Sequence, residues 1–150
     1  MAAIATDRFS AQELAAWRGM LQVHSELTQV LDAQMRAEHG MPVSMYEVLM
    51  FLGDAPDRRL RMAEIAERVL LSRSGLTRLV DRLEALGYVT RCASEDDGRG
   101  LYAKLTDAGV TKLEEARRTH LEGVREIFLQ RLSDADQRAL ADIWSRFDAS

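Results

Sequence analysis

The sequence has a single cysteine, only two prolines and no apolar run long enough to cross a membrane. Because Cys92 stands alone, no disulfide can form within one chain, which is typical of a protein in a reducing compartment. The first residues, MAAIATDRFSAQ, lack the basic and then apolar pattern of a secretory signal. We therefore expect a cytoplasmic protein that does not enter membranes.

Motifs of catalysis and metal binding are also missing. The sequence has no glycine-rich phosphate loop, no HExxH motif and no evident Ser/His/Asp grouping. The acidic run Glu95–Asp97 is expected to be a solvated turn rather than a metal site, and Cys92 a small buried strand residue rather than a redox sensor. We expect no enzyme activity, no metal and no cofactor.

The charge of the chain is unevenly distributed. The formal net charge is −4 over 150 residues, a length typical of one domain. Between Arg58 and Lys104 there are ten basic and seven acidic residues, a balance of +3, and the remainder carries −7. A basic middle between acidic flanks indicates a local surface for anions.

Helix signals cover most of the chain. Ser10–Glu13 and Ser44–Glu47 both have the pattern of a capping box, and Thr106 and Ser133 are weaker N-cap candidates. The expected helices cover Ala11–Glu38, Met45–Leu52, two short stretches within Met62–Gly87, Asp107–Arg131 and Asp134–Phe147.

A β-hairpin is expected between the short helices and the long ones. The runs YVTRC and LYAKL are separated by ASEDDGRG, which has two glycines and three acids. In the second run Leu101, Ala103 and Leu105 alternate with polar positions, as in a half-buried strand.

The stretch MAEIAERVLLSRSGLTRLVDRLEALG predicts a helix-turn-helix. In its second helix one stripe is apolar and expected in the core: Leu76, Leu79, Val80, Leu83 and Leu86. Small and charged residues lie opposite or on the flanks: Ser74, Thr77, Arg78, Asp81, Arg82 and Ala85. Small residues allow close approach to a DNA groove, and arginine donates in a fork to phosphate or guanine.

These residues predict a surface for double-stranded DNA. The second helix would enter the major groove with Arg73, Ser74, Thr77, Arg78 and Arg82, and Ser72 at its N-cap would leave amides for a phosphate. The hairpin would act as a wing whose tip carries Asp97 and Arg99, and Arg99 would enter a narrow minor groove.

Three segments resemble the MarR family of bacterial winged-helix transcription regulators: AEIAERVLLSRSGLTRLVDRLEALGYV, the DGR tip, and KLTDAG before the next long helix. The resemblance implies a mainly α fold with a small β-hairpin wing, a DNA-binding lobe over about 43–105, and dimerisation helices over about 10–38 and 107–148. The family tip has two consecutive arginines, whereas here Gly98 precedes Arg99, which implies weaker minor-groove contact.

The resemblance also implies a homodimer, because the long terminal helices carry more apolar residues than one small lobe could cover. An intramolecular bundle is the alternative for these helices. A two-fold dimer predicts a near-palindromic operator with half-sites about 34–36 Å apart. The family further implies repression relieved by a small aromatic or lipophilic effector, for which the candidate crevice residues are Trp17, His24, Met45 and Tyr46, all of which could equally be core.

Three other possibilities remain open from the sequence. Zinc-responsive relatives take ligands near the ends of comparable helices, but Glu38, His39 and His120 lack an i, i+4 partner and a nearby cysteine. The family's hydroperoxide sensors carry a cysteine in the first helix, where this chain has none. A winged-helix module that binds protein and not DNA is the alternative function, supported by the acidic flanks and the altered tip.

Overall fold

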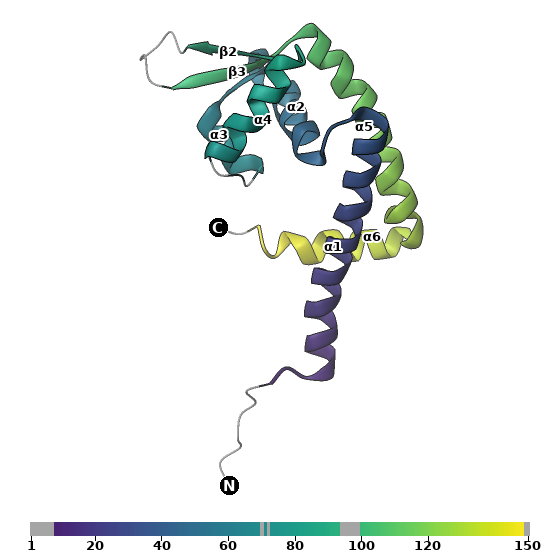
Figure 1. Ribbon diagram of the computed structural model, residues 1–150. Coiled ribbons are helices and arrows are strands. Elements are labelled where there is room, and N and C mark those ends of the chain that lie inside the picture. The colour runs from purple at the N-terminus through teal and green to yellow at the C-terminus, as the bar shows by residue number, and fades with distance from the viewer. Residues whose placement is uncertain (1–7, 70, 72, 94–99, 149–150) are drawn as a thin grey trace.

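Six α-helices and a small antiparallel sheet make up the computed structural model, which describes residues 8–69, 71, 73–93 and 100–148 (Figure 1). In chain order the elements are α1 (Ala11–His39), α2 (Val43–Asp54), the 3-10 turn η1 (Pro56–Arg58), β1 (Arg59–Arg61), α3 (Met62–Val69), α4 (Arg73–Ala85), β2 (Val89–Ala93), β3 (Leu101–Leu105), α5 (Asp107–Ile127), the 3-10 turn η2 (Leu129–Arg131) and α6 (Asp134–Ser145). No described helix has the length and apolar content needed to span a membrane.

The wing hairpin is confirmed, but it belongs to a three-stranded sheet ordered β1-β3-β2. The two predicted strands pair antiparallel, with Val89 opposite Leu105 and Ala93 opposite Leu101. The third strand, β1, lies outside the expected hairpin and pairs with the other side of β3. A three-residue strand is too short to show a period-2 pattern, so only the tertiary pairing reveals it.

The buried core lies where α2, α3 and α4 pack against the sheet and α5. Helix α2 is apolar on nearly all sides, and Met45, Val48, Leu49 and Leu52 are all fully buried in it. Helices α3, α4 and α5 and strands β2 and β3 add further apolar residues to this core: Ile65, Leu76, Val80, Leu83, Val89, Ala103 and Leu113. The helix-turn-helix is therefore held by a core that extends through the whole lobe.

The helix starts follow the caps with one exception. Ser10 forms the predicted capping box with Glu13, Thr106 caps α5, and Ser133 makes a full capping box with Asp136. The predicted box at Ser44–Glu47 is wrong: α2 begins earlier, at Val43, after Pro42. The reason is tertiary, because the Val43 amide donates to Asp32 Oδ1 of α1 at 2.9 Å and needs no serine.

Two helix ends and one core assignment also differ from expectation. Helix α5 ends at Ile127 and gives way to η2, and α6 ends at Ser145. Leu86, predicted in the core stripe of α4, is 54% exposed. It lies one residue beyond the end of α4, where Gly87 takes a left-handed φ of 81° and the chain turns away from the core.

The long helices form an arm that leaves the lobe. In Figure 1, α1 runs away from the sheet and α2–α4, α5 follows it from the lobe, and α6 lies far from the wing. Helix α1 packs against α5, yet Met35, near its C-terminal end, is its only fully buried residue. No residue of α6 is buried among those the structure describes. The arm thus leaves apolar side chains uncovered in the single chain.

Candidate nucleic-acid interface

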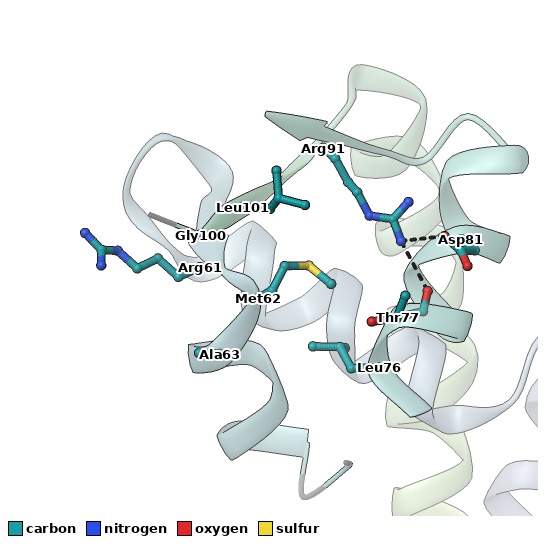
Figure 2. Close-up of a pocket in the computed structure, with 9 residues that line it drawn as sticks. All are labelled: Arg61, Met62, Ala63, Leu76, Thr77, Asp81, Arg91, Gly100 and Leu101. Atoms are coloured by element: carbon teal, nitrogen blue, oxygen red, sulfur yellow. Dashed lines mark hydrogen bonds and ion pairs between the residues drawn. The ribbon is translucent and has the colours of Figure 1, made fainter. Parts of the chain in front are cut away.

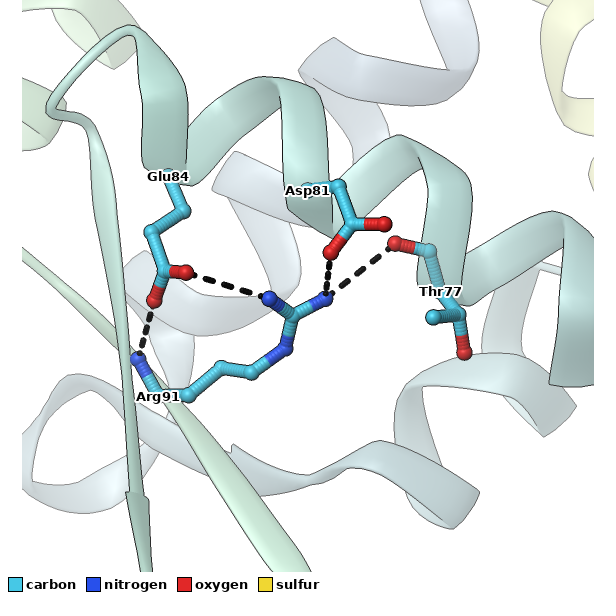
Figure 3. A network of polar contacts seen from close by, with 4 residues as sticks. All are labelled: Thr77, Asp81, Glu84 and Arg91. Carbon is cyan, nitrogen blue, oxygen red and sulfur yellow. Dashed lines mark hydrogen bonds and ion pairs between the residues drawn. The ribbon is translucent and has the colours of Figure 1, made fainter.

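Helix α4 presents three different faces. Leu76, Val80 and Leu83 point into the core and are at most 1% exposed. On the opposite side Ser74, Arg78, Arg82 and Ala85 are exposed, as their helical spacing predicts. Between these two, Thr77, Asp81 and Glu84 form a stripe that faces the wing (Figure 3). The helix is therefore anchored on two sides, and its third side faces solvent.

The predicted DNA-contacting residues fall into two groups. Ser74, Thr77, Arg78 and Arg82 are described and all are exposed. Arg73 begins α4, but its side chain lies outside what is described, and Ser72, Asp97 and Arg99 lie outside the described residues altogether. Five of the eight predicted residues therefore lie on α4, and four of them have described side chains.

Among the described residues of the wing, an arginine connects the sheet to α4. Arg91 of β2 is half-buried and reaches across to the helix. Its Nη2 donates to Asp81 Oδ1 at 2.5 Å and to the Thr77 carbonyl at 3.2 Å, and its Nη1 donates to Glu84 Oε1 at 3.1 Å (Figure 3). The Arg91 amide donates to the other oxygen of Glu84 at 3.0 Å. Because the guanidinium is planar, these bonds fix both the distance and the orientation of α4 relative to the wing.

Sequence reasoning missed Arg91 as a functional residue. The signal in the sequence is limited to two carboxylates, Asp81 and Glu84, which lie three residues apart on neighbouring parts of the helix surface. The helical spacing places Asp81 on the side opposite the core and does not indicate a partner for it. A strand arginine ten residues later could be matched to this carboxylate only once the fold had placed β2 beside α4.

A cavity of about 760 Å³ lies between the wing, α4 and the start of α3 (Figure 2). Its walls are mainly apolar, with Met62, Leu76 and Leu101 facing inward, while Arg61 extends away from it. Thr77, Asp81 and Arg91 supply its polar side. The contacts that hold α4 thus line a space large enough for a small organic molecule.

The four predicted crevice residues lie in two separate places. Trp17 is 52% exposed on α1, and His24 is exposed about two turns further along the same helix. Met45 and Tyr46 are buried in α2. The Tyr46 ring packs against His120 of α5, with 4.8 Å between ring centroids. Within the described single chain these residues therefore do not converge on one crevice.

His39, one of the two histidines considered as zinc ligands, is hydrogen-bonded to residues of α5. His39 Nε2 lies 2.7 Å from Thr119 Oγ1, which donates to Glu38 Oε2 at 2.9 Å. Lys112 Nζ lies 3.2 Å from His39 Nδ1. Because an ammonium can only donate, Nδ1 is the acceptor and the ring is neutral. This chain of bonds joins the end of α1 to α5.

A helix-turn-helix whose second helix is braced by an adjoining antiparallel hairpin is the architecture of a winged-helix protein. The profile of the MarR family matches residues 39–100. Sco3205 of Streptomyces coelicolor, a MarR family transcriptional regulator solved in complex with DNA, superposes with a TM-score of 0.87 at 35% identity, covering 94% of this chain and 92% of that one.

Two further relatives are also transcriptional regulators. AbsC, a MarR family transcriptional regulator of Streptomyces coelicolor, superposes with a TM-score of 0.84 at 30% identity and covers 97% of this chain and 100% of its own. The transcriptional repressor YetL of Bacillus subtilis is 27% identical over 91% of this chain and 83% of that protein. This chain belongs to the MarR family of transcriptional regulators, whose members named here are regulators and not enzymes.

The bond between Arg91 and Asp81 can be measured by a double-mutant cycle. We expect the double variant Arg91→Ala/Asp81→Ala to lose less free energy of unfolding than the two single variants lose in sum. The difference, which is the coupling energy, should be at most about 1 kcal/mol because Asp81 is more than half exposed. Urea unfolding of the four proteins measures it. The exposed pair Arg146–Asp142 on α6 is the control and should couple by only about 0.3–0.5 kcal/mol. Equal coupling in both pairs would contradict the bracing role.

Burial, and then the nearby Lys112 charge, lowers the pKa of His39 below its ordinary 6.5, while Glu38 and Glu115 oppose the shift. As the pH falls, the unfolded chain therefore takes up a proton at this ring at a higher pH than the folded chain does. We expect the contribution of His39 to stability to be constant well above pH 6.5 and to fall as the pH drops below it. Urea midpoints at fixed protein concentration should fall less in His39→Gln than in the wild type. His120, whose pKa burial also lowers, is present in both proteins, so the difference reports on His39.

Proposed function

We propose that this chain is a sequence-specific DNA-binding regulator that inserts α4 into the major groove. The observation that carries the proposal is the outward face of α4: Ser74, Arg78 and Arg82 are exposed while the wing and the core hold the other two faces. Such a helix presents its polar side chains in a fixed orientation. The structural relative Sco3205, solved with DNA, supports the same assignment.

Each exposed residue suits a different contact. The short Ser74 side chain lets the helix approach the floor of the groove, and Thr77 at its flank can reach a base edge or phosphate. Arg78 and Arg82 can donate in pairs to guanine or to backbone oxygens. Arg73 at the start of the helix and Ser72 before it would contact phosphate. For the wing tip, the proposal keeps Asp97 and Arg99 as minor-groove residues.

The working form is proposed to be a homodimer formed by the terminal helices. Large apolar side chains are exposed there on both arms: Trp17, Leu21, Val23 and Val30 on α1, with Ile143 and Trp144 on α6 and Phe147 beyond it. An exposed apolar surface of this extent is typical of a protein interface. In a two-fold dimer the two α4 helices would read half-sites about 34–36 Å apart.

The dimer is further proposed to act in the cytoplasm as a repressor that a small aromatic or lipophilic ligand releases. The name of YetL, a transcriptional repressor, supports the direction of regulation. The cavity between α4 and the wing supports a ligand, because a molecule against Met62, Leu76 and Leu101 would lie beside the Arg91 bonds that orient α4. A ligand that favours a displaced α4 would lower the population of the DNA-binding form.

Arg78→Ala tests the reading surface. We expect it to cost about 1–3 kcal/mol in binding to a sequence selected by the wild type, and to relax the preference at the base it contacts. Mobility shift at physiological salt measures the affinity, and selection from a random duplex pool measures the preference. Ser145→Ala on the far end of α6 is the control and should bind like the wild type. Unchanged affinity and preference in Arg78→Ala would remove α4 from the interface.

Trp144→Asp tests the homodimer. A carboxylate in an apolar interface loses its hydration, so we expect the mass from light scattering to fall from near twice 16.9 kDa toward one chain. Gln137→Asp, on the exposed first turn of the same helix, should leave the mass unchanged. The proposal would be wrong if the wild type itself is a monomer at micromolar concentration while still binding DNA.

A further inference from the structure

A second basic surface lies on the face of the wing sheet that is turned away from α4. On β1 the buried Leu60 stands between two exposed arginines, and on β3 the buried Ala103 precedes an exposed lysine. Since side chains alternate along a strand, the polar residues of both strands share one face. We name this the outer sheet face and define it as Arg59, Arg61, Tyr102 and Lys104.

The register of the sheet places like charges side by side on this face. Arg59 lies directly opposite Lys104, and Arg61 lies opposite Tyr102. Two cations in directly opposed positions of an antiparallel pair destabilise the sheet. An anion bound at this position would reduce the repulsion between Arg59 and Lys104.

Next to this pair the surface is hollowed. A depression of about 400 Å³ is lined by Asp57, Arg58, Arg59 and Lys104. Arg58 Nη1 lies 3.4 Å from Asp107 Oδ1, so three cations stand here against two carboxylates, and Arg59 and Lys104 supply the excess positive charge. Asp57 and Arg58 both have a φ of 55°, in the left-handed region that side chains other than glycine rarely adopt. Two such residues in succession cost free energy, and strain of this kind is concentrated at binding sites.

Tyr102 fixes two arginines in place on the same face. The guanidinium carbons of Arg59 and Arg61 lie 5.1 Å and 5.6 Å from the centre of its ring. Arg61 Nε also donates to the Tyr102 hydroxyl at 3.2 Å. Cations held by an aromatic ring lose less freedom when they bind, so the face is preorganised for an extended anion.

This surface cannot contact the same stretch of duplex as α4. Arg91 projects from the inner side of the sheet to α4, so α4 and the outer sheet face lie on opposite sides of the strands. A straight duplex in contact with α4 would not reach the outer sheet face. DNA beyond the half-site could reach it by bending around the wing, and each phosphate contact would help to offset the cost of bending.

We propose that the outer sheet face binds backbone phosphates of the DNA that flanks the operator, so that DNA longer than the operator bends around the wing. The inference rests on the proposed function, because it needs a duplex already held by α4. Charge complementarity supports DNA as the occupant, since the chain from Arg58 to Lys104 carries +3 while the remainder carries −7. Flanking DNA is favoured over a second duplex because it is present at a high effective concentration.

The experiment compares two lengths of DNA. A binding site is selected by the wild type from a random duplex pool and trimmed by footprinting to its minimal length. A second probe carries the same site with one further helical turn of fixed sequence on each side. Fluorescence anisotropy gives the affinity for both probes over a range of salt concentrations. For the wild type we expect tighter binding and a steeper salt dependence on the longer probe.

The test variant is Arg59→Ala/Lys104→Ala, whose two side chains are exposed. We expect it to bind the minimal site like the wild type and to lose the gain on the longer probe. Its salt slope there should fall by about 2, because each lost phosphate contact removes about 0.9. Arg59→Lys, which keeps the charge, should retain most of the gain. Arg118→Ala/Arg125→Ala on α5 removes two exposed arginines elsewhere and should behave like the wild type.

Several results would overturn the inference. An equal gain from flanking DNA in the wild type and the double variant would show that the outer sheet face does not contact it. An equal loss on both probes would place these residues on the operator itself. A gain on the minimal site from unlabelled non-operator duplex added separately would assign the face to a second duplex. If the wild type selects no sequence at all, the proposed function fails, and this inference fails with it.

Discussion

The orientation of α4 depends on the guanidinium of Arg91, which binds three groups of the helix. A helix packed on a core by leucines can still rotate or slide by small amounts, because apolar contacts have no direction. The bonds from Arg91 to Asp81, Glu84 and the Thr77 carbonyl add that direction. They also make the wing and the helix one unit, so a shift of either moves the other. The outward face of α4 is defined by this brace.

The join between arm and lobe is also polar. Asp32 of α1 accepts from the first amide of α2 while holding Arg36 at 2.7 Å, and His39 links the end of α1 to α5. Between them Gly40 turns the chain with a φ of 66°, where a residue with a Cβ would be strained. These bonds fix the end of the arm against α5 and α2, and α2 lies at the centre of the core of the lobe.

Charged and apolar residues are distributed differently between the lobe and the arm. The lobe contains the segment with a net charge of +3 and a complete core, whereas the remainder carries −7 and leaves aromatic residues such as Trp17 and Trp144 exposed. An isolated chain exposes this apolar surface to water, which is typical of a surface that takes part in an interface. The same separation places the outward face of α4 and the outer sheet face together on the lobe.

The sequence by itself determined what depends on local periodicity and local caps. The apolar repeat and the Ser10 capping box defined α1, the alternation in Leu101–Leu105 defined β3, and the spacing of Leu76, Val80 and Leu83 predicted which side of α4 faces solvent. These signals arise between residues a few positions apart, so they survive without the fold.

Tertiary structure alone decided the rest, because it depends on residues far apart in the chain. The start of α2 is set by Asp32 from another helix, and β1 exists only because β3 lies beside it. Arg91 finds its acceptors only after the wing folds back on α4, and the like-charged pair of Arg59 and Lys104 is created by strand register. No local pattern encodes such contacts, since their partners are chosen by packing of the whole lobe.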